Sequence, residues 1–258
     1  AEYISKNLVS VLRNKLPLTM KIENQIKKAP NALKQSFVKI DTDYKKLARG
    51  GKMSGATTAV AVLLFERKYV IANIGDSRCM LINRNGRLRQ LTKDHTLCDP
   101  NERSAIITRS LYYNPPHVCV ENWGDEYEDD WRVTNSHKTI GLSCARSIGY
   151  YTDDNNNVIT ELNNAVTPDY LKANPNNIRS GSMVDIKVVN RSTTDAWLVL
   201  ASDGLWDGAD FEKDDISRVI KMEERKGGTA KTIAKELVRM AFKKKSNDNI
   251  TVLVIDLR

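Results

Sequence analysis

The stretch ASDGLWDG, residues 201–208, directly follows the apolar run AWLVL at residues 196–200. A continuous apolar run is typical of a buried strand, and an Asp-Gly pair is typical of the turn that ends one. Asp203 is therefore expected at the rim of a core, where the preceding strand holds its carboxylate in place. Such a position suits a metal ligand, but it also suits an ordinary turn. The stretch alone leaves both interpretations open.

Two further aspartates stand at comparable positions. Asp76 lies in the segment GDSR (75–78) at the end of an apolar run, and Asp248 comes just before the last apolar run of the chain. Antiparallel strands can bring such ends together. Hard divalent cations prefer carboxylate oxygens held on a rigid frame. The three aspartates therefore indicate a site for Mg²⁺ or Mn²⁺, and ions bound there would serve phosphoester hydrolysis.

Helices are expected where apolar residues recur every three or four positions. The first covers about residues 4–12, the second follows Pro30 and ends near Leu47, and the third runs from Pro100 to about Ile107. Two more are expected around residues 216–220 and 233–240, and Thr229 caps the second of these.

Between the helices, apolar segments predict an antiparallel meander, with strands at residues 57–65, 69–74, 80–82 and 87–91. The final segment, 250–257, is apolar on both faces and is expected to be a central strand. Segment 111–136, with acidic residues near 125–130, is expected to be an irregular surface insertion. Because helices and strands do not alternate strictly, the expected fold class is α+β.

The composition excludes several classes of protein. No apolar run approaches the roughly 18 residues of a membrane span. The four cysteines show no Cys-x-x-Cys spacing, so reduced thiols in an intracellular protein, cytoplasmic or nuclear, are expected. The net charge of +8 suits an acidic or phosphorylated partner, but no basic stripe interleaves with aromatic residues. We expect a monomer that binds neither nucleic acid nor membrane.

Six motifs, in this order, resemble the metal-dependent serine/threonine phosphatases of type 2C. They are SGATT (54–58), GDSR (75–78), LTKDH (91–95), LSCARSIG (142–149), ASDGLWD (201–207) and SNDNITV (246–252). The resemblance covers nearly the whole chain and implies one domain over residues 1–258, a four-layer α-β-β-α sandwich of two antiparallel sheets flanked by helices. It implies a protein phosphatase that hydrolyses phosphoserine and phosphothreonine of phosphorylated protein substrates by attack of a metal-bridging water.

The resemblance also implies roles for particular residues. Asp203 and Asp248 correspond to ligands of a binuclear Mg²⁺ or Mn²⁺ centre, and Asp76 corresponds to a ligand of a third ion. No catalytic residue beyond these ligands is expected. The residues expected to support the ligands are Gly204, Asn249, Ser77 and Arg146. Trp206 and Asp207 are expected to support the loop rather than to bind metal.

One motif of the family has no counterpart. Asp-Gly-His-Gly-Gly supplies an aspartate that bridges two ions and a histidine proposed as general acid, yet no histidine follows either Asp-Gly pair here. Two interpretations stay open: a fragment that lacks the N-terminal strands, or a catalytically inactive pseudophosphatase that acts as a regulatory or binding protein. The three retained carboxylates favour the fragment, because clustered carboxylates repel one another unless a cation binds. His95 is expected to be a hydrogen-bonded structural histidine.

Overall fold

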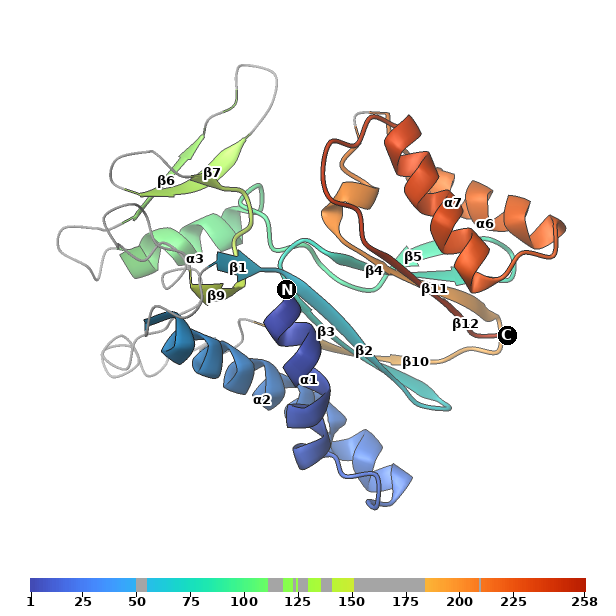
Figure 1. The fold of residues 1–258 in the computed structure, drawn as a ribbon, viewed down its shortest axis with the longest axis horizontal. Helices are drawn as coiled ribbons and strands as arrows, with labels where there is room; N and C mark the ends of the chain where they lie inside the picture. The colour runs from blue at the N-terminus through green and yellow to red at the C-terminus, as the bar shows by residue number, and fades with distance from the viewer. Residues whose placement is uncertain are drawn as a thin grey trace. The chain divides into compact units, whose positions relative to one another are not determined.

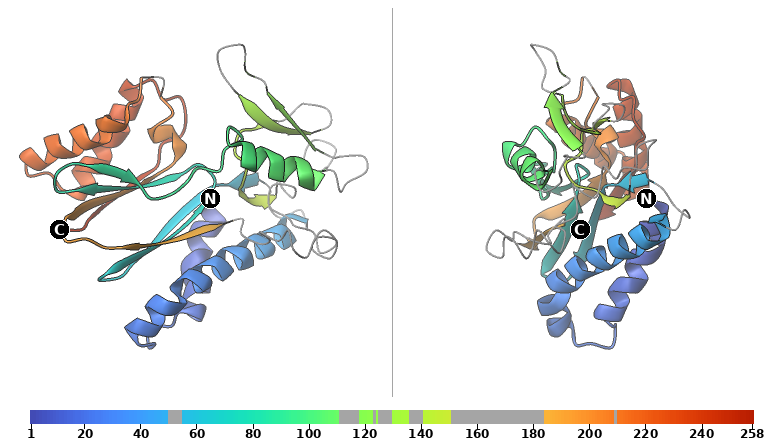
Figure 2. Two further views of the ribbon diagram at one scale, coloured as in Figure 1. Left: turned by 180° about the vertical axis from the view of Figure 1, so that it is seen from behind. Right: turned by 90° about the vertical axis from the view of Figure 1, so that its left-hand side faces the viewer.

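The structure is a computed structural model. It describes residues 1–49, 55–110, 118–122, 124, 130–135, 141–150, 184–208 and 210–258. The chain divides into two compact units, which are Ala1–Ala59 with His95–Ile186 and Val60–Asp94 with Lys187–Arg258. Figures 1 and 2 show the elements of both units. None of the helices in these ranges is long and apolar enough to cross a membrane.

The first unit contains a pair of packed helices, α1 (Glu2–Lys15) and α2 (Ile22–Arg49). The prediction that the second helix follows Pro30 is wrong, because α2 begins at Ile22 and continues through the proline. A proline inside a helix removes one backbone hydrogen bond. The apolar face compensates for that loss, since Ala29 and Leu33 on either side of the proline are buried.

Among the residues that the structure describes, the first unit also contains one helix and five short strands. These are β1 (Gly55–Thr57), α3 (Pro100–Ser110), β6 (Val118–Asn122), β7 (Trp131–Asn135), β8 (Gly141–Leu142) and β9 (Ile148–Tyr150). Strand β1 pairs with β9, so the single strand predicted for residues 57–65 is divided at Thr58.

The expectation of an irregular segment at 111–136 is wrong for β6 and β7, which pair antiparallel. These strands are short and carry mixed polar and apolar residues, so the sequence gives them no clear alternation. Residues 125–129 of the acidic cluster lie outside the described residues. Asp130 accepts a hydrogen bond from Arg132 Nε at 2.6 Å.

Two sheets are formed mainly by residues of the second unit, with Ala59, Asp185 and Ile186 of the first unit at the start of two strands. The first has the order β10-β3-β2 and the second the order β12-β11-β4-β5. Their bounds are β2 (Ala59–Leu64), β3 (Lys68–Ile74), β4 (Arg78–Asn83), β5 (Leu88–Gln90), β10 (Asp185–Asn190), β11 (Asp195–Ala201) and β12 (Val252–Asp256). Every pair in the second sheet is antiparallel. The predicted tight turn between β4 and β5 is present, with Gly86 at a φ of +81°.

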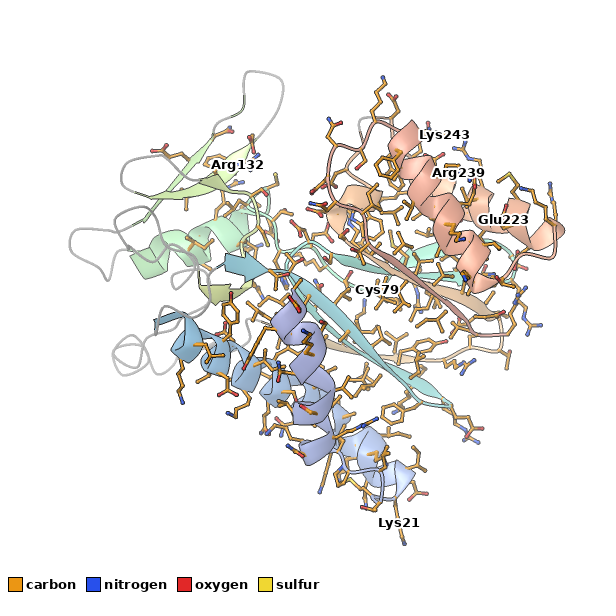
Figure 3. The ribbon with its side chains drawn as sticks, viewed as in Figure 1. Lys21, Cys79, Arg132, Glu223, Arg239 and Lys243 are labelled. Carbon is orange, nitrogen blue, oxygen red and sulfur yellow. The ribbon has the colours of Figure 1, made fainter. Side chains whose placement is uncertain are left out.

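Strand β11 is buried on both faces, as its sequence predicts. Leu198 and Leu200 join the apolar cluster between the two sheets, which also contains Cys79 of β4 (labelled in Figure 3). Trp197 and Val199 point the other way and join the cluster under α6 (Lys213–Arg225) and α7 (Ala230–Lys243). These helices lie side by side over the second sheet (Figure 1). Helices and antiparallel sheets together confirm the α+β class.

The final strand differs from its prediction. Strand β12 is at the edge of the second sheet rather than at its centre, and Leu253 is 54% exposed. Its apolar pattern has another cause: Val254 packs towards α6 and α7, while Ile255 packs between the sheets. Burial on both faces therefore arises from the layers above and below the strand and does not require a strand on each side.

Candidate functional site

Strand pairing in the second unit brings Asp76 and Asp203 to one edge of the second sheet, the edge formed by the end of β11 and the start of β4. Ala201, the last residue of β11, lies opposite Arg78, the first residue of β4. Asp203 comes two residues after Ala201, and Asp76 comes two residues before Arg78. Because the two strands are antiparallel, both aspartates emerge beyond the same end of the ladder.

Asp248 approaches this edge from the other neighbour of β11. Ala201 also lies opposite Val252, and Asp248 comes four residues before that valine. The turns that carry Asp203 and Asp248 are in direct contact. A Cβ built on Gly204 would lie 2.7 Å from the backbone oxygen of Asn249, so only glycine fits between them without a shift.

Two serine side chains join the same two turns. Ser202 Oγ donates to the Asn249 oxygen at 3.0 Å and accepts from the Thr251 amide at 3.0 Å. Ser246 Oγ, which is buried, donates to the Gly204 oxygen at 2.6 Å. The sequence analysis missed both serines, although each stands within a motif that it quotes. These contacts set the position of one aspartate turn relative to the other.

Mutual repulsion identifies the carboxylates as one electrostatic group. Burial and then the charge of Asp203 raise the pKa of Asp76 to about 6. Partial burial, followed by the charge of Asp203, also raises the pKa of Asp207 to about 6. Burial and then the charge of Asp248 raise the pKa of Asp203. We call Asp76, Asp203, Asp207 and Asp248 the aspartate edge.

Asp207 was expected only to support the loop. In the structure its carboxylate interacts with the charge of Asp203, so it belongs to the aspartate edge. The short helical turn η1 (Asp203–Leu205) produces this arrangement, and the Asp207 amide donates to the Asp203 oxygen at 3.0 Å. Residues four apart lie on the same side of a helical turn. The spacing Asp-x-x-x-Asp was therefore the signal that could have identified Asp207.

The turn of Asp76 is fixed by hydrogen bonds from Asn73, near the end of β3. The sequence analysis missed this residue. Asn73 is buried, and its Nδ2 donates to the oxygens of Gly75 at 3.1 Å and Lys93 at 2.9 Å. Ser77, a predicted supporting residue, is 6% exposed beside Asp76. The turn after β3 is thereby tied to the turn after β5.

The aspartate edge matches a hard divalent cation in donor chemistry, since all its side-chain donors are carboxylate oxygens. The side chains are nevertheless not arranged as a ready ligand set. In the ranges that the structure describes, no three carboxylate, histidine or cysteine side chains are gathered closely enough to hold a metal ion. Repulsion between carboxylates favours rotamers that separate their charges. The ligand roles of Asp76, Asp203 and Asp248 therefore stay predictions.

Arg146 and His95 lie in the first unit, in a charged network of their own. Arg146 Nε donates to Glu102 at 2.8 Å, and Arg146 Nη1 donates to Asp185 at 3.1 Å. His95 is fully buried, with Nε2 3.1 Å from Asp185 Oδ2, and this contact lowers the pKa of Asp185. The burial agrees with the structural role expected for His95. The supporting role of Arg146 towards the metal ligands stays a prediction.

Sheets, covering helices and an acidic edge define an α+β protein whose strand ends gather carboxylates. Its sequence matches the family described as Protein phosphatase 2C over residues 2–250. The chain therefore belongs to the protein phosphatase 2C family.

Individual relatives agree with this assignment. The chain is 27% identical over 261 residues to Protein phosphatase 1L of Bos taurus, covering 100% of this chain and 60% of that protein. It is 31% identical over 242 residues to a protein kinase and PP2C-like domain-containing protein of Arabidopsis thaliana, covering 89% of this chain and 30% of that protein. The chain thus spans less than two thirds of the length of these relatives.

Solved structures show the same fold. A serine-threonine phosphatase 2C from Toxoplasma gondii superposes with a TM-score of 0.67 at 19% identity, covering 100% of this chain and 82% of that chain. A C. elegans sex determining protein superposes with a TM-score of 0.68 at 17% identity, covering 100% of this chain and 53% of that chain. At these identities the likeness concerns the fold alone.

Proposed function

We propose that this chain forms a metal-dependent phosphatase domain, spanning residues 1–258, that removes phosphate from phosphoserine and phosphothreonine in proteins. The observation that carries the proposal is the convergence of Asp76, Asp203 and Asp248 at one sheet edge in a member of this family. The raised pKa values of Asp76, Asp203 and Asp207 support it, because a cation would offset the burial and the repulsion that raise them.

In this proposal Asp203 and Asp248 bind the ions of the main centre and Asp76 binds a further ion. Bound Mg²⁺ or Mn²⁺ would neutralise phosphate oxygens and supply an acidified water for attack on phosphorus. The residues of this chain contribute position: Gly204 allows the close approach of two turns, and Ser202 and Ser246 hold them together. The expected partner is a phosphorylated protein, bound by a monomer.

Hydrolysis of a phosphothreonine peptide tests the proposal. The reaction should be measured with and without Mn²⁺, both for residues 1–258 and for the complete gene product. We expect the complete gene product to hydrolyse the peptide only when Mn²⁺ is present, and we expect the Asp203→Asn substitution to abolish this turnover. Metal-independent turnover, or turnover that survives this substitution, would contradict the proposed mechanism.

A second candidate is a pseudophosphatase that binds phosphoproteins without hydrolysing them. It is favoured by one observation: the described residues contain no three side chains already gathered for a metal ion. This candidate predicts binding of the phosphothreonine peptide with no turnover by the complete gene product at any Mn²⁺ concentration. Measured binding and measured turnover on the same preparation separate the two functions.

A further inference from the structure

We propose that Asp94, Arg78 and Trp206 form a clamp that positions the turn of Asp203 against the turn of Asp76. The inference concerns positioning rather than contact with substrate. It deepens the proposed function, since a positioned aspartate edge matters only if that edge binds a cation. The evidence is a chain of contacts that joins the two turns.

The first contact fixes the guanidinium of Arg78. Its Nε donates to Asp94 Oδ2 at 2.7 Å, and its Nη2 lies 2.7 Å from the same oxygen. Gln90 Nε2 donates to the other oxygen of Asp94 at 2.9 Å. Both partners of the ion pair are largely shielded, with side chains 22% and 18% exposed. A shielded pair with this geometry restrains the arginine far better than an exposed one.

The second contact carries this restraint to the Asp203 turn. The guanidinium carbon of Arg78 lies 5.1 Å from the centre of the Trp206 ring, within range of a cation–π interaction. Trp206 immediately follows η1, and its amide donates to the Asp203 oxygen at 2.8 Å. Its Nε1 is buried with no hydrogen-bond partner among the described residues. Core packing and the arginine therefore hold this indole.

The remaining contacts close the arrangement on the Asp76 side. Arg78 is two residues after Asp76, and Asn73 ties the Gly75 oxygen to the Lys93 oxygen, next to Asp94. Asp94 is thus held relative to the Asp76 turn by hydrogen bonds from the Asn73 side chain, and it holds the arginine that stacks on Trp206. Residues that orient metal ligands in this way commonly change metal affinity by about 10–100-fold when they are removed.

The same unit offers a matched control at the other end of β11. Arg258 Nε and Nη2 bind Asp256 at 3.0 and 2.9 Å, and the arginine stacks 4.2 Å from the ring of Trp197. Trp197 pairs with Asp256 in the sheet, four residues away from Ala201. This group also joins an arginine, an aspartate and a tryptophan ring, and it lies away from the aspartate edge. Its ion pair is more exposed, and Glu224 contacts both Arg258 and Trp197. Arg258→Gln therefore controls for the loss of a stacked, paired arginine.

The test measures hydrogen exchange of the Leu205, Trp206 and Asp207 amides in metal-free protein, which requires no phosphatase activity. We expect Arg78→Gln and Asp94→Asn each to speed exchange at these amides about tenfold, and the double variant to add little, because the two residues act as a unit. Arg78→Lys should behave like Arg78→Gln, since lysine keeps the charge but loses the fork and the stack. Unchanged exchange at these amides in both single variants would overturn the proposal. So would an equal increase at the same amides in Arg258→Gln.

Calorimetric titration with Mn²⁺ then connects the clamp to the site. Positioning predicts that Arg78→Gln weakens Mn²⁺ binding by about tenfold. If Arg78 acted only as a nearby positive charge, its removal would tighten binding, and that result would also overturn the inference. If the unaltered protein binds no Mn²⁺, the proposed function fails and so does the role of the clamp in metal binding. The exchange data then still report whether the clamp holds the turn.

Discussion

Gly204 lies so close to Asn249 that a Cβ at position 204 would be 2.7 Å from the asparagine backbone oxygen. This contact makes the two aspartate-bearing turns one packed unit. It also explains why the strand end needs glycine directly after Asp203. The arrangement gives a direct test of whether the spacing of these turns matters for the site.

Gly204→Ala should force the two turns apart. We expect a loss of about 1–3 kcal/mol in the free energy of unfolding, as for other overpacked positions, together with weaker Mn²⁺ binding. Urea unfolding and calorimetry measure the two effects. Gly227→Ala is the control, because Gly227 has open space around it but a φ of +71°. The control should lose stability through backbone strain while its Mn²⁺ binding stays unchanged.

Asp203→Asn and Asp248→Asn should each weaken Mn²⁺ binding strongly, by more than the roughly 10–100-fold typical of an outer-shell residue. Asp76→Asn should spare the tightest site and affect only a weaker one. Calorimetric titration of the three variants distinguishes these outcomes. Unchanged tight binding in the first two variants would remove Asp203 and Asp248 from the ligand set.

The metal-free protein should lose stability as the pH rises from about 4 to above 6. The pKa values of Asp76 and Asp207 are raised to about 6 in the fold, against 3.8 for an ordinary aspartate. The fold therefore favours the protonated carboxyls, and their contribution is complete below pH 3.8 and lost as the pH passes 6. After allowance for solvent screening we expect about 1–2 kcal/mol in total.

Urea unfolding in EDTA, from pH 4 to pH 7, measures this dependence. Asp76→Asn should flatten the profile, because the amide cannot ionise, and should be more stable than the unaltered protein at pH 7. A profile that rises over this range in the unaltered protein but not in the variant would contradict the assigned direction. Adding Mn²⁺ at pH 7 should restore stability to the unaltered protein.

Arg146→Ala should destabilise the first unit by about 2–4 kcal/mol. The substitution removes both contacts that the guanidinium, through Nη2 and Nε, makes with the buried Glu102 carboxylate. Arg132→Ala breaks a more exposed pair with Asp130 and should cost less than about 1 kcal/mol. Thermal unfolding of both variants gives the comparison. Equal losses would mean that the network around Arg146 behaves as an ordinary surface pair.

The convergence of the aspartates could be predicted because each follows or precedes an apolar strand and stands beside a residue that permits a turn. The α+β class followed from the same apolar runs. The edge position of β12 could not be predicted from its apolar residues. These residues pack against the layers above and below the sheet, and they do so in an edge strand as well as in a central one. The continuation of α2 through Pro30 depends on burial of Ala29 and Leu33, which is a tertiary effect.

Asp94 and Arg78 show a different limit. Both lie in motifs that the sequence displays, yet nothing in their spacing indicates that they pair with each other or that the arginine reaches Trp206. Such a contact depends on the register between β4, β5 and β11, which brings the β4–β5 hairpin beside a strand that is distant in sequence. Long-range register of this kind is not encoded in local periodicity.

The central claim is that Asp203 and Asp248 together bind the ions of the main centre at a shared sheet edge. Substoichiometric Mn²⁺, a paramagnetic ion, should broaden the amide resonances of Gly204 and Asn249 before others, and Asp203→Asn should abolish this effect. Broadening confined to other parts of the protein, or to only one of these two turns, would contradict the claim.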